Sequence, residues 1–397
     1  MKRKLVWLIF ILMALLVAGC RGSDNDSSSA KNDNGYDNQY DYTYGIPDFP
    51  ALHNFGVVAL NNTGSICILD GSDLKISAPL LTGKFGNYVG GLYDVVISPD
   101  GKTTVVSNFG DSMVYFIDTS NPSSPRVRGS AEIGFFAEDM DVTPDGRYLL
   151  VTNGGFASRI AVLDLDSQKV VENDAPVATL YHNAVSASPD GRTVITADYY
   201  ANYVHVFTLS RSGILQYKDS IEADRPVNLT ISPDGKTVIV ASAPNTGELN
   251  YPVLEIKAPG NVRLSQIVTQ NAGLSGAQSV AFNQAGNRAY IHCTGHENVI
   301  VELQKNFMGK WETGKMIPVE IYGTSHLFGV DTMAMNYRNG YLYVSNPTVW
   351  DGTPYVVVVD VNEGRVVKML DTRYPPESGV IPKISIPTGI AFWNPVR

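Results

Sequence analysis

The stretch Ser98-Pro99-Asp100-Gly101 returns three more times along the chain. Its copies begin at Thr143, Ser188 and Ser232, at spacings of 45, 45 and 44 residues. Each copy lies between an apolar run and a β-branched run, and the succession of proline, aspartate and glycine is typical of a tight turn between strands. A fixed period in the low forties indicates stacked repeats, and we predict a β-propeller.

Weaker copies extend the repeat towards the C-terminus. Turn-like stretches at 281–286 and 335–340 hold the same place, with glycines 51 and 54 residues after their predecessors. The segment 55–81 supplies three strands (55–60, 65–69 and 75–81) without a first strand, and 387–393 has the pattern of a first strand alone. We therefore predict an all-β, seven-bladed β-propeller over residues 50–397, closed by a composite blade of N- and C-terminal strands.

The N-terminus has the order of a secretory signal. Three cations at positions 2–4 precede an apolar run over 5–18, which is short for a spanning helix. Val17-Ala18-Gly19-Cys20 resembles the bacterial lipobox, in which the cysteine becomes the acylated first residue of the mature protein. We expect a signal peptide at 1–19, lipidation of Cys20 and a disordered tether at 20–49, which is poor in aliphatic residues. An ordinary signal anchor is the alternative.

Charge and cysteine content restrict the functions. Without residues 1–19 the chain keeps 27 cations and 39 anions, a net charge of −12, so we expect no nucleic-acid partner. Cys67 and Cys293 lie in separate strand-like runs, and we expect both to be buried free thiols. We expect a monomer that is lipid-anchored in the bacterial cell envelope, outside the cytoplasm, with the outer membrane or the cell surface favoured because Arg21 follows Cys20.

The repeat unit resembles the YVTN-type repeats of lactonase-like seven-bladed propellers. The resemblance covers residues 50–397 and rests on the Ser-Pro-Asp-Gly turn and on second strands that end in Ser-Asn or Thr-Asn, at 107–108, 152–153 and 345–346. The segment 116–125 also resembles an LVIVD-type repeat. The resemblance implies the architecture, but not one chemistry, because such folds include lactonases, cycloisomerases, electron-transfer subunits and binding proteins.

The starts of the innermost strands should surround one mouth of the central channel. Alignment on the turn glycines places Leu92, Ala137, His182, Pro226, Ala277, Asp331 and Pro387 at equivalent positions. Carboxylates gather there, and Ca²⁺ takes oxygen ligands of this kind, so we predict a metal site at Asp94, Glu138, Asp139 and Asp331. A bound cation could polarise a lactone carbonyl, with His182 or His326 as catalytic base. Alternatively, these side chains solvate the channel and bond to blade backbones.

Aromatic-rich connections should also reach this mouth. Long loops on one face of a rigid scaffold are a usual place for binding. The residues that we assign to a ligand- or partner-binding face are Tyr88, Phe136, Tyr199, Tyr200, Arg225, Phe328 and Trp350.

No motif of a hydrolase elbow, phosphate loop or zinc protease is present in the sequence. We therefore interpret the protein as a non-enzymatic, membrane-anchored scaffold that binds a protein or small ligand through the mouth. One alternative is a lactonase-like hydrolase with an acidic centre, with or without bound Ca²⁺. Another is an accessory subunit of a redox complex.

Overall fold

A computed structural model gives the structure of the chain. It describes residues 54–81, 84–85, 91–153, 159–172, 181–243, 248–270, 274, 276–294, 298–319, 332–346, 355–372 and 387–394. The predicted signal peptide, Cys20 and the tether lie outside the described residues. No helix in the described part of the chain has the length and apolarity needed to cross a membrane.

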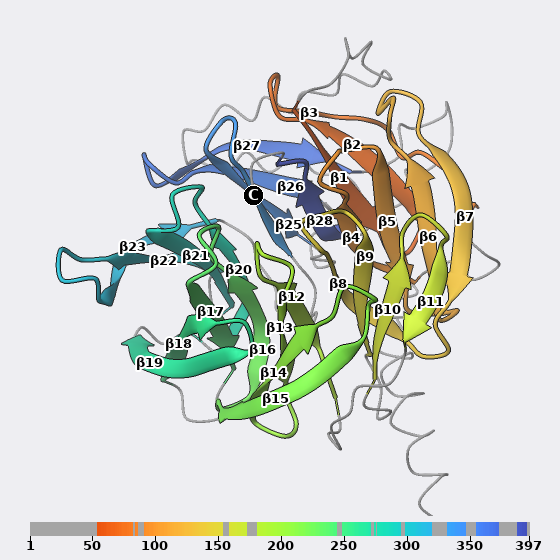
Figure 1. Ribbon diagram of the computed structural model, residues 1–397. Helices are drawn as coiled ribbons and strands as arrows, with labels where there is room; N and C mark the ends of the chain where they lie inside the picture. The colour runs from red at the N-terminus through yellow and green to blue at the C-terminus, as the bar shows by residue number, and fades with distance from the viewer. Residues whose placement is uncertain are drawn as a thin grey trace, which may run out of the picture. The chain divides into compact units, whose positions relative to one another are not determined.

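The described strands form seven antiparallel four-stranded sheets, which confirms the predicted all-β propeller (Figure 1). In the ring, the innermost strands of consecutive sheets lie beside one another. Six blades are continuous in sequence. They are β4 (Leu92–Ile97), β5 (Thr103–Asn108), β6 (Met113–Asp118) and β7 (Arg126–Glu132); β8 (Ala137–Val142), β9 (Tyr148–Asn153), β10 (Ile160–Asp164) and β11 (Lys169–Glu172); β12 (Ala184–Ala187), β13 (Thr193–Asp198), β14 (Tyr203–Leu209) and β15 (Leu215–Glu222); β16 (Pro226–Ile231), β17 (Thr237–Ser242), β18 (Leu249–Ala258) and β19 (Asn261–Gln270); β20 (Gly276–Phe282), β21 (Arg288–Thr294), β22 (Val299–Lys305) and β23 (Trp311–Pro318); β24 (Met333–Asn336), β25 (Tyr341–Asn346), β26 (Tyr355–Asp360) and β27 (Arg365–Asp371).

The seventh blade joins the two ends of the chain, as predicted. Its order is β28 (Pro387–Phe392), β1 (Phe55–Leu60), β2 (Ser65–Asp70) and β3 (Lys75–Ile76). In Figure 1, dark-blue β28 lies against orange β1. The closure removes the open sheet edge that β1 would otherwise present.

The predicted strand 75–81 is wrong in length, because β3 covers only two residues. The Ser77 hydroxyl oxygen accepts the backbone N–H of Ile68 at 2.9 Å, in place of a strand-to-strand bond. Pro79 follows and offers no N–H to a ladder. The Ser77 backbone N–H still donates to the Ile68 carbonyl at 2.8 Å, and a single bridge between Ile66 and Leu80 follows.

The repeated tetrapeptide forms the turn that the sequence predicts. In the first copy, the Ser98 hydroxyl donates to Asp100 Oδ1 at 2.7 Å, and the Gly101 N–H donates to the Ser98 carbonyl at 2.8 Å. Gly101 has φ +74°, which favours glycine. The turns also touch across blades, because a Cβ on Gly235 would lie 3.2 Å from Pro189 Cδ of the preceding copy. We call the side of the ring that carries these turns the turn face, and the opposite side the mouth face.

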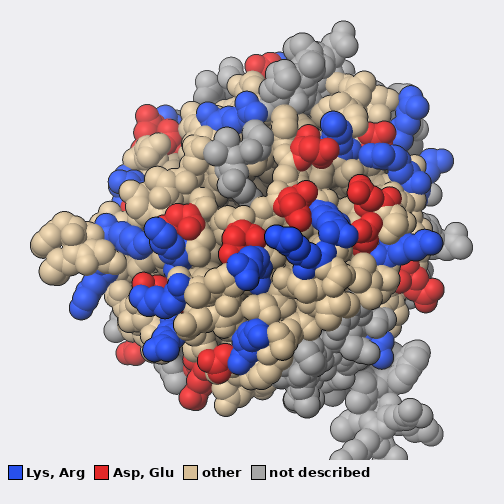
Figure 2. Space-filling view, in the orientation of Figure 1, with Lys and Arg blue, Asp and Glu red and all other residues tan. Residues whose placement is uncertain are grey.

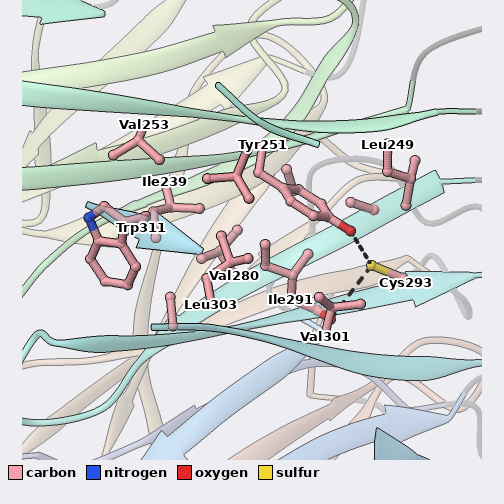
Figure 3. Close-up of a cluster of buried hydrophobic side chains, with 14 of the residues drawn as sticks. Ile239, Leu249, Tyr251, Val253, Val280, Ile291, Cys293, Val301, Leu303 and Trp311 are labelled. Carbon is pink, nitrogen blue, oxygen red and sulfur yellow. Dashed lines mark hydrogen bonds between the residues drawn. The ribbon is translucent and has the colours of Figure 1, made fainter. Parts of the chain in front are cut away.

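The core lies between blades rather than within them. In Figure 3, Ile239, Tyr251 and Val253 from one blade pack against Val280, Ile291 and Trp311 from the next. Tyr251 Oη lies 3.2 Å from Cys293 Sγ, whose thiol lies 3.7 Å from the Ile291 carbonyl. Cys67 and Cys293 are buried and free, as predicted. Sandwiching explains why inner strands such as β1 are buried on both faces, whereas outer β7 alternates.

Candidate functional site

A bulge shapes the start of several innermost strands at the mouth face. The pairing of each with its second strand shifts register at the same place in four blades, between Leu92 and Val95, Ala137 and Met140, Pro226 and Asn228, and Ala277 and Ser279. A bulge bends the strand and turns side chains away from the regular alternation. Glu138 and Asp139 both lie inside the second of these bulges, and both are buried.

Glu138 is a buried carboxyl group whose two oxygens differ in hydrogen bonding. Its side chain is 1% exposed, and its Oε1 accepts the Tyr181 hydroxyl at 3.1 Å. Its Oε2 has no hydrogen-bond partner among the residues that the structure describes. Burial raises the pKa of Glu138 well above its ordinary value, although the Tyr181 bond favours ionisation. A ligand that donates to this oxygen would therefore relieve a buried, half-satisfied carboxyl group.

Asp94 and Asp139 differ from Glu138, since each accepts a backbone N–H group of the next blade. Asp94 Oδ2 accepts the backbone N–H of Met140 at 2.9 Å, and Asp139 Oδ2 accepts that of Val185 at 2.7 Å. An innermost strand has no further strand on its channel side, so its N–H groups need other acceptors. These contacts match the alternative in which mouth side chains bond to blade backbones.

The predicted metal set is only partly described. Asp331 lies outside the described residues, so the full set stays a prediction. Within the described ranges, no group of three or more His, Cys, Asp and Glu side chains is arranged to hold a metal ion.

His182 lies in a buried polar row that crosses its blade. Its Nδ1 is 2.9 Å from Thr196 Oγ1, and its ring centroid is 5.4 Å from that of His205. His205 Nδ1 is in turn 2.7 Å from Ser220 Oγ, and its Nε2 is 3.6 Å from Asp198 Oδ2. Burial and the neighbouring His205 lower the pKa of His182 to about 3, although Asp198 opposes this shift. With a pKa of about 3 and its Nδ1 against Thr196, His182 is a weak base and fits the predicted role of catalytic base poorly.

Aromatic side chains surround Glu138 on two sides. On one side Phe109 stacks on Phe136, with ring centroids 4.8 Å apart, and Tyr93 lies 5.4 Å from Phe109. Burial raises the pKa of Tyr93, and Glu138 adds to this rise. Phe136 is 36% exposed, so this stack reaches the surface.

The second aromatic group belongs to the β12–β15 blade. Tyr181 and Tyr199 both contact Tyr200, with ring centroids 5.2 and 5.1 Å away, and Arg225 lies 4.5 Å over the Tyr199 ring. Tyr200 is 51% exposed. The structure thus brings the predicted Tyr199, Tyr200 and Arg225 together, beside the hydroxyl that contacts Glu138. Of the other predicted site residues, Tyr88, His326, Phe328 and Trp350 lie outside the described residues.

Two cavities lie elsewhere in the propeller. One of about 460 Å³ is on the turn face between the β20–β23 and β24–β27 blades, lined by Asn283, Arg288, Tyr337 and Asn362 among others. The other, of about 190 Å³, includes Met140, Met333 and Met335 and reaches the turns at Pro99 and Pro144. Neither includes Glu138. We favour the mouth face as the candidate site because it combines exposed aromatic rings with a buried carboxyl group.

Comparison with known proteins supports the fold. No family model and no curated protein matches the sequence. Among solved structures, a functionally unknown protein from Desulfotomaculum acetoxidans is 21% identical, with a TM-score of 0.70 over 85% of this chain and 98% of that one. The periplasmic gluconolactonase of Pseudomonas aeruginosa is 18% identical, with a TM-score of 0.64 over 85% and 99%. Hydrazine synthase of Kuenenia stuttgartiensis is 21% identical, with a TM-score of 0.55 over 69% and 78%. At these identities the likeness concerns the fold alone: the chain is a seven-bladed β-propeller with lactonase-like structural neighbours.

Proposed function

We propose that the protein is a ligand-binding propeller, held on the outer side of a bacterial membrane by acyl chains on Cys20, whose mouth face captures a small organic ligand. The environment of the Glu138 carboxyl group is the observation that carries this proposal. Its carboxyl group is buried, bonds to Tyr181 through one oxygen, and keeps the other without a partner among the described residues. Folding such a group into a protein costs free energy, which a matching ligand group would recover.

The surroundings of Glu138 define the class of ligand. A positive group beside Oε2 would favour ionisation of the buried carboxyl group. The exposed rings of Phe136 and Tyr200 offer flat apolar surface, and aromatic faces also attract cations. We therefore propose a small organic cation with a flat apolar part, bound with its charged end at Glu138.

Tyramine is a suitable probe because it joins an ammonium group to one aromatic ring. We expect tyramine to bind the parent protein in isothermal titration calorimetry, and the E138Q variant to bind at least tenfold more weakly. Glu132 lies exposed at the end of β7, so E132Q is the matched control and should bind like the parent. Equal affinity of E138Q and the parent for tyramine would contradict the proposed site.

The membrane anchor has its own test. The C20S variant should lose the acyl chains, seen in the mass of the N-terminal peptide, and should move from the membrane to the soluble fraction. If the parent protein stays in the membrane while its Cys20 carries no acyl chain, a signal anchor is favoured instead.

Lactone hydrolysis is the second candidate, and the raised pKa of Glu138 beside a tyrosine hydroxyl favours it. In its ionised form Glu138 would take a proton from water as the water oxygen attacks the lactone carbonyl, and the ring oxygen would leave with a proton. Release of acid from glucono-1,5-lactone by the parent, lost in E138Q, would establish this activity. Metal analysis of the same protein tests the predicted Ca²⁺ site. The redox-subunit alternative, which the hydrazine synthase likeness favours, predicts copurification of a cytochrome.

A further inference from the structure

The tip of the β22–β23 hairpin projects two large apolar side chains into solvent. Phe307 is 97% exposed and Met308 is 66% exposed, the highest values among the large hydrophobic residues that the structure describes. In Figure 1 the hairpin extends outward from its blade, and Figure 2 shows it as a tan projection bordered by blue Lys and Arg side chains. Exposed apolar side chains at such a projection mark an interaction site.

The turn that presents this pair is well defined. Asn306 Oδ1 accepts the backbone N–H groups of Met308 at 3.0 Å and Lys310 at 3.1 Å, and Gly309 adopts a φ of +77°. At the base, Trp311 is 4% exposed, and its backbone N–H and carbonyl both bond to the Gln266 side chain of β19. The exposure of Phe307 and Met308 is therefore built into the hairpin by bonds at its tip and at its base.

Positive charge accompanies the apolar pair. Lys305 and Lys310 flank the tip, and Lys315 lies exposed further along β23, with Glu312 as the single acidic residue of the hairpin between 305 and 318. This excess of cations lies on a chain whose formal net charge is −9. Lysines near an apolar insertion are attracted to anionic lipid headgroups.

The tip and the N-terminal end of the propeller lie on the same face. The Lys305 backbone N–H donates at 3.0 Å to the backbone carbonyl of Asn287, which lies in the turn between β20 and β21. This bond places the hairpin tip on the turn face. Asn54, the residue before β1, accepts a hydrogen bond from Asn336 at 2.8 Å, where the turn between β24 and β25 begins. The segment that leads from Cys20 therefore enters the propeller on the turn face too.

We propose that the β22–β23 hairpin tip inserts Phe307 and Met308 into the bilayer interface, with exposed Lys310 among the headgroups. The inference uses the proposed Cys20 anchor to bring the bilayer near. The 34 residue-to-residue steps from Cys20 to Asn54 span at most about 110–120 Å when extended, which is ample for the turn face to reach the membrane. The insertion turns the mouth face, with Glu138, away from the lipid.

Fluorescence quenching by lipid tests the insertion directly. The acylated full-length F307W variant is placed in vesicles of phosphatidylethanolamine and phosphatidylglycerol that carry a doxyl-labelled lipid. The parent protein supplies the background of its native tryptophans. I214W is the matched control, because Ile214 is 46% exposed at the corresponding turn of the β14–β15 hairpin. We expect the added emission of F307W to be quenched at least twofold more strongly than that of I214W.

Two further measurements test the role of the Lys310 charge and whether lipid or a second copy of the protein contacts the hairpin tip. K310E in the F307W background should reduce the quenching in anionic vesicles but not in phosphatidylcholine vesicles. Equal quenching of F307W and I214W overturns the proposal, whether or not Cys20 is acylated. A blue shift of F307W emission that rises with protein concentration without lipid would identify a second copy as the occupant and would also overturn it. The mass of the Cys20 peptide reports separately whether the anchor is present.

Discussion

Asp94 Oδ2 accepts the backbone N–H of Met140 at 2.9 Å, and this bond joins two neighbouring blades at the channel. The same relationship recurs one blade later between Asp139 and Val185, at 2.7 Å. Further along the ring, the Thr230 hydroxyl donates to the Val280 carbonyl at 2.9 Å. Polar side chains of the innermost strands thus connect adjacent blades where no further strand pairs with them.

Removal of the Asp94 carboxylate should destabilise the whole ring. We expect D94A to lower the free energy of unfolding by on the order of 1–3 kcal/mol, because the acceptor is lost and the Met140 N–H stays buried. Urea denaturation measures the loss. D73A is the control, since Asp73 is 58% exposed in its ion pair with Lys75, and it should change stability little. A D94A midpoint equal to that of D73A would contradict the inter-blade role.

Gly389 should not tolerate alanine, because β28 passes close to β4. A Cβ at this position would lie 2.6 Å from Asp94 Cα and 2.8 Å from the Val95 nitrogen, both backbone atoms. We expect G389A to lower the melting temperature and cost about 1–3 kcal/mol through forced separation of the two strands. G64A serves as comparison, since Gly64 has a φ of +54° but open space around it. The clash explanation fails if G389A is as stable as the parent.

Glu138 should make the protein less stable as the pH rises. Burial raises its pKa in the folded state, so from the ordinary value of about 4.5 upward the unfolded chain releases a proton that the folded chain retains. Unfolding becomes more favourable over this interval, up to the folded-state pKa. E138Q should remove this decline, and denaturation at a series of pH values measures it. Parallel pH profiles for E138Q and the parent would contradict the assignment.

His292 should make the protein less stable as the pH falls, the opposite of the effect of Glu138. Burial lowers its pKa from 6.5 to about 4, so between these values the unfolded chain binds a proton that the folded chain does not. Stability is therefore lost as the pH falls through this interval. H292N should reduce the slope of unfolding free energy against pH by about 1.4 kcal/mol per pH unit, one proton's share. His182 remains in this variant and keeps part of the acid sensitivity, so an unchanged slope in H292N would contradict the prediction.

Much of the architecture could be predicted because the turn sequence repeats. The spacing of the Ser98–Gly101 stretch and its copies indicates the period, and the unpaired pattern of 387–393 indicates the composite blade. Both depend on local turn chemistry and strand patterning, which a sequence displays directly.

The candidate site could be predicted only in outline. Asp94, Glu138 and Asp139 are alike in sequence. Packing alone separates the two that accept backbone N–H groups of the next blade from Glu138, which accepts the Tyr181 hydroxyl. The bulge that changes the direction of the Glu138 side chain has no clear sequence pattern, because the strand is short and buried. Alignment on the turn glycines drew attention to His182 and missed Tyr181, its direct neighbour. Phe109 was missed too, although a large apolar residue after a strand-ending asparagine was a usable signal.

The composite blade can form only after β28 has been synthesised. The Thr388 hydroxyl donates to the Ala59 carbonyl across 329 residues of chain. During synthesis β1 therefore remains without its partner β28 until the other described strands have been made. Any truncated product would leave the edge of β1 bare, and a bare edge invites aggregation or degradation. A chain cut before β28 thus differs from one that contains this strand in a way that proteases can detect.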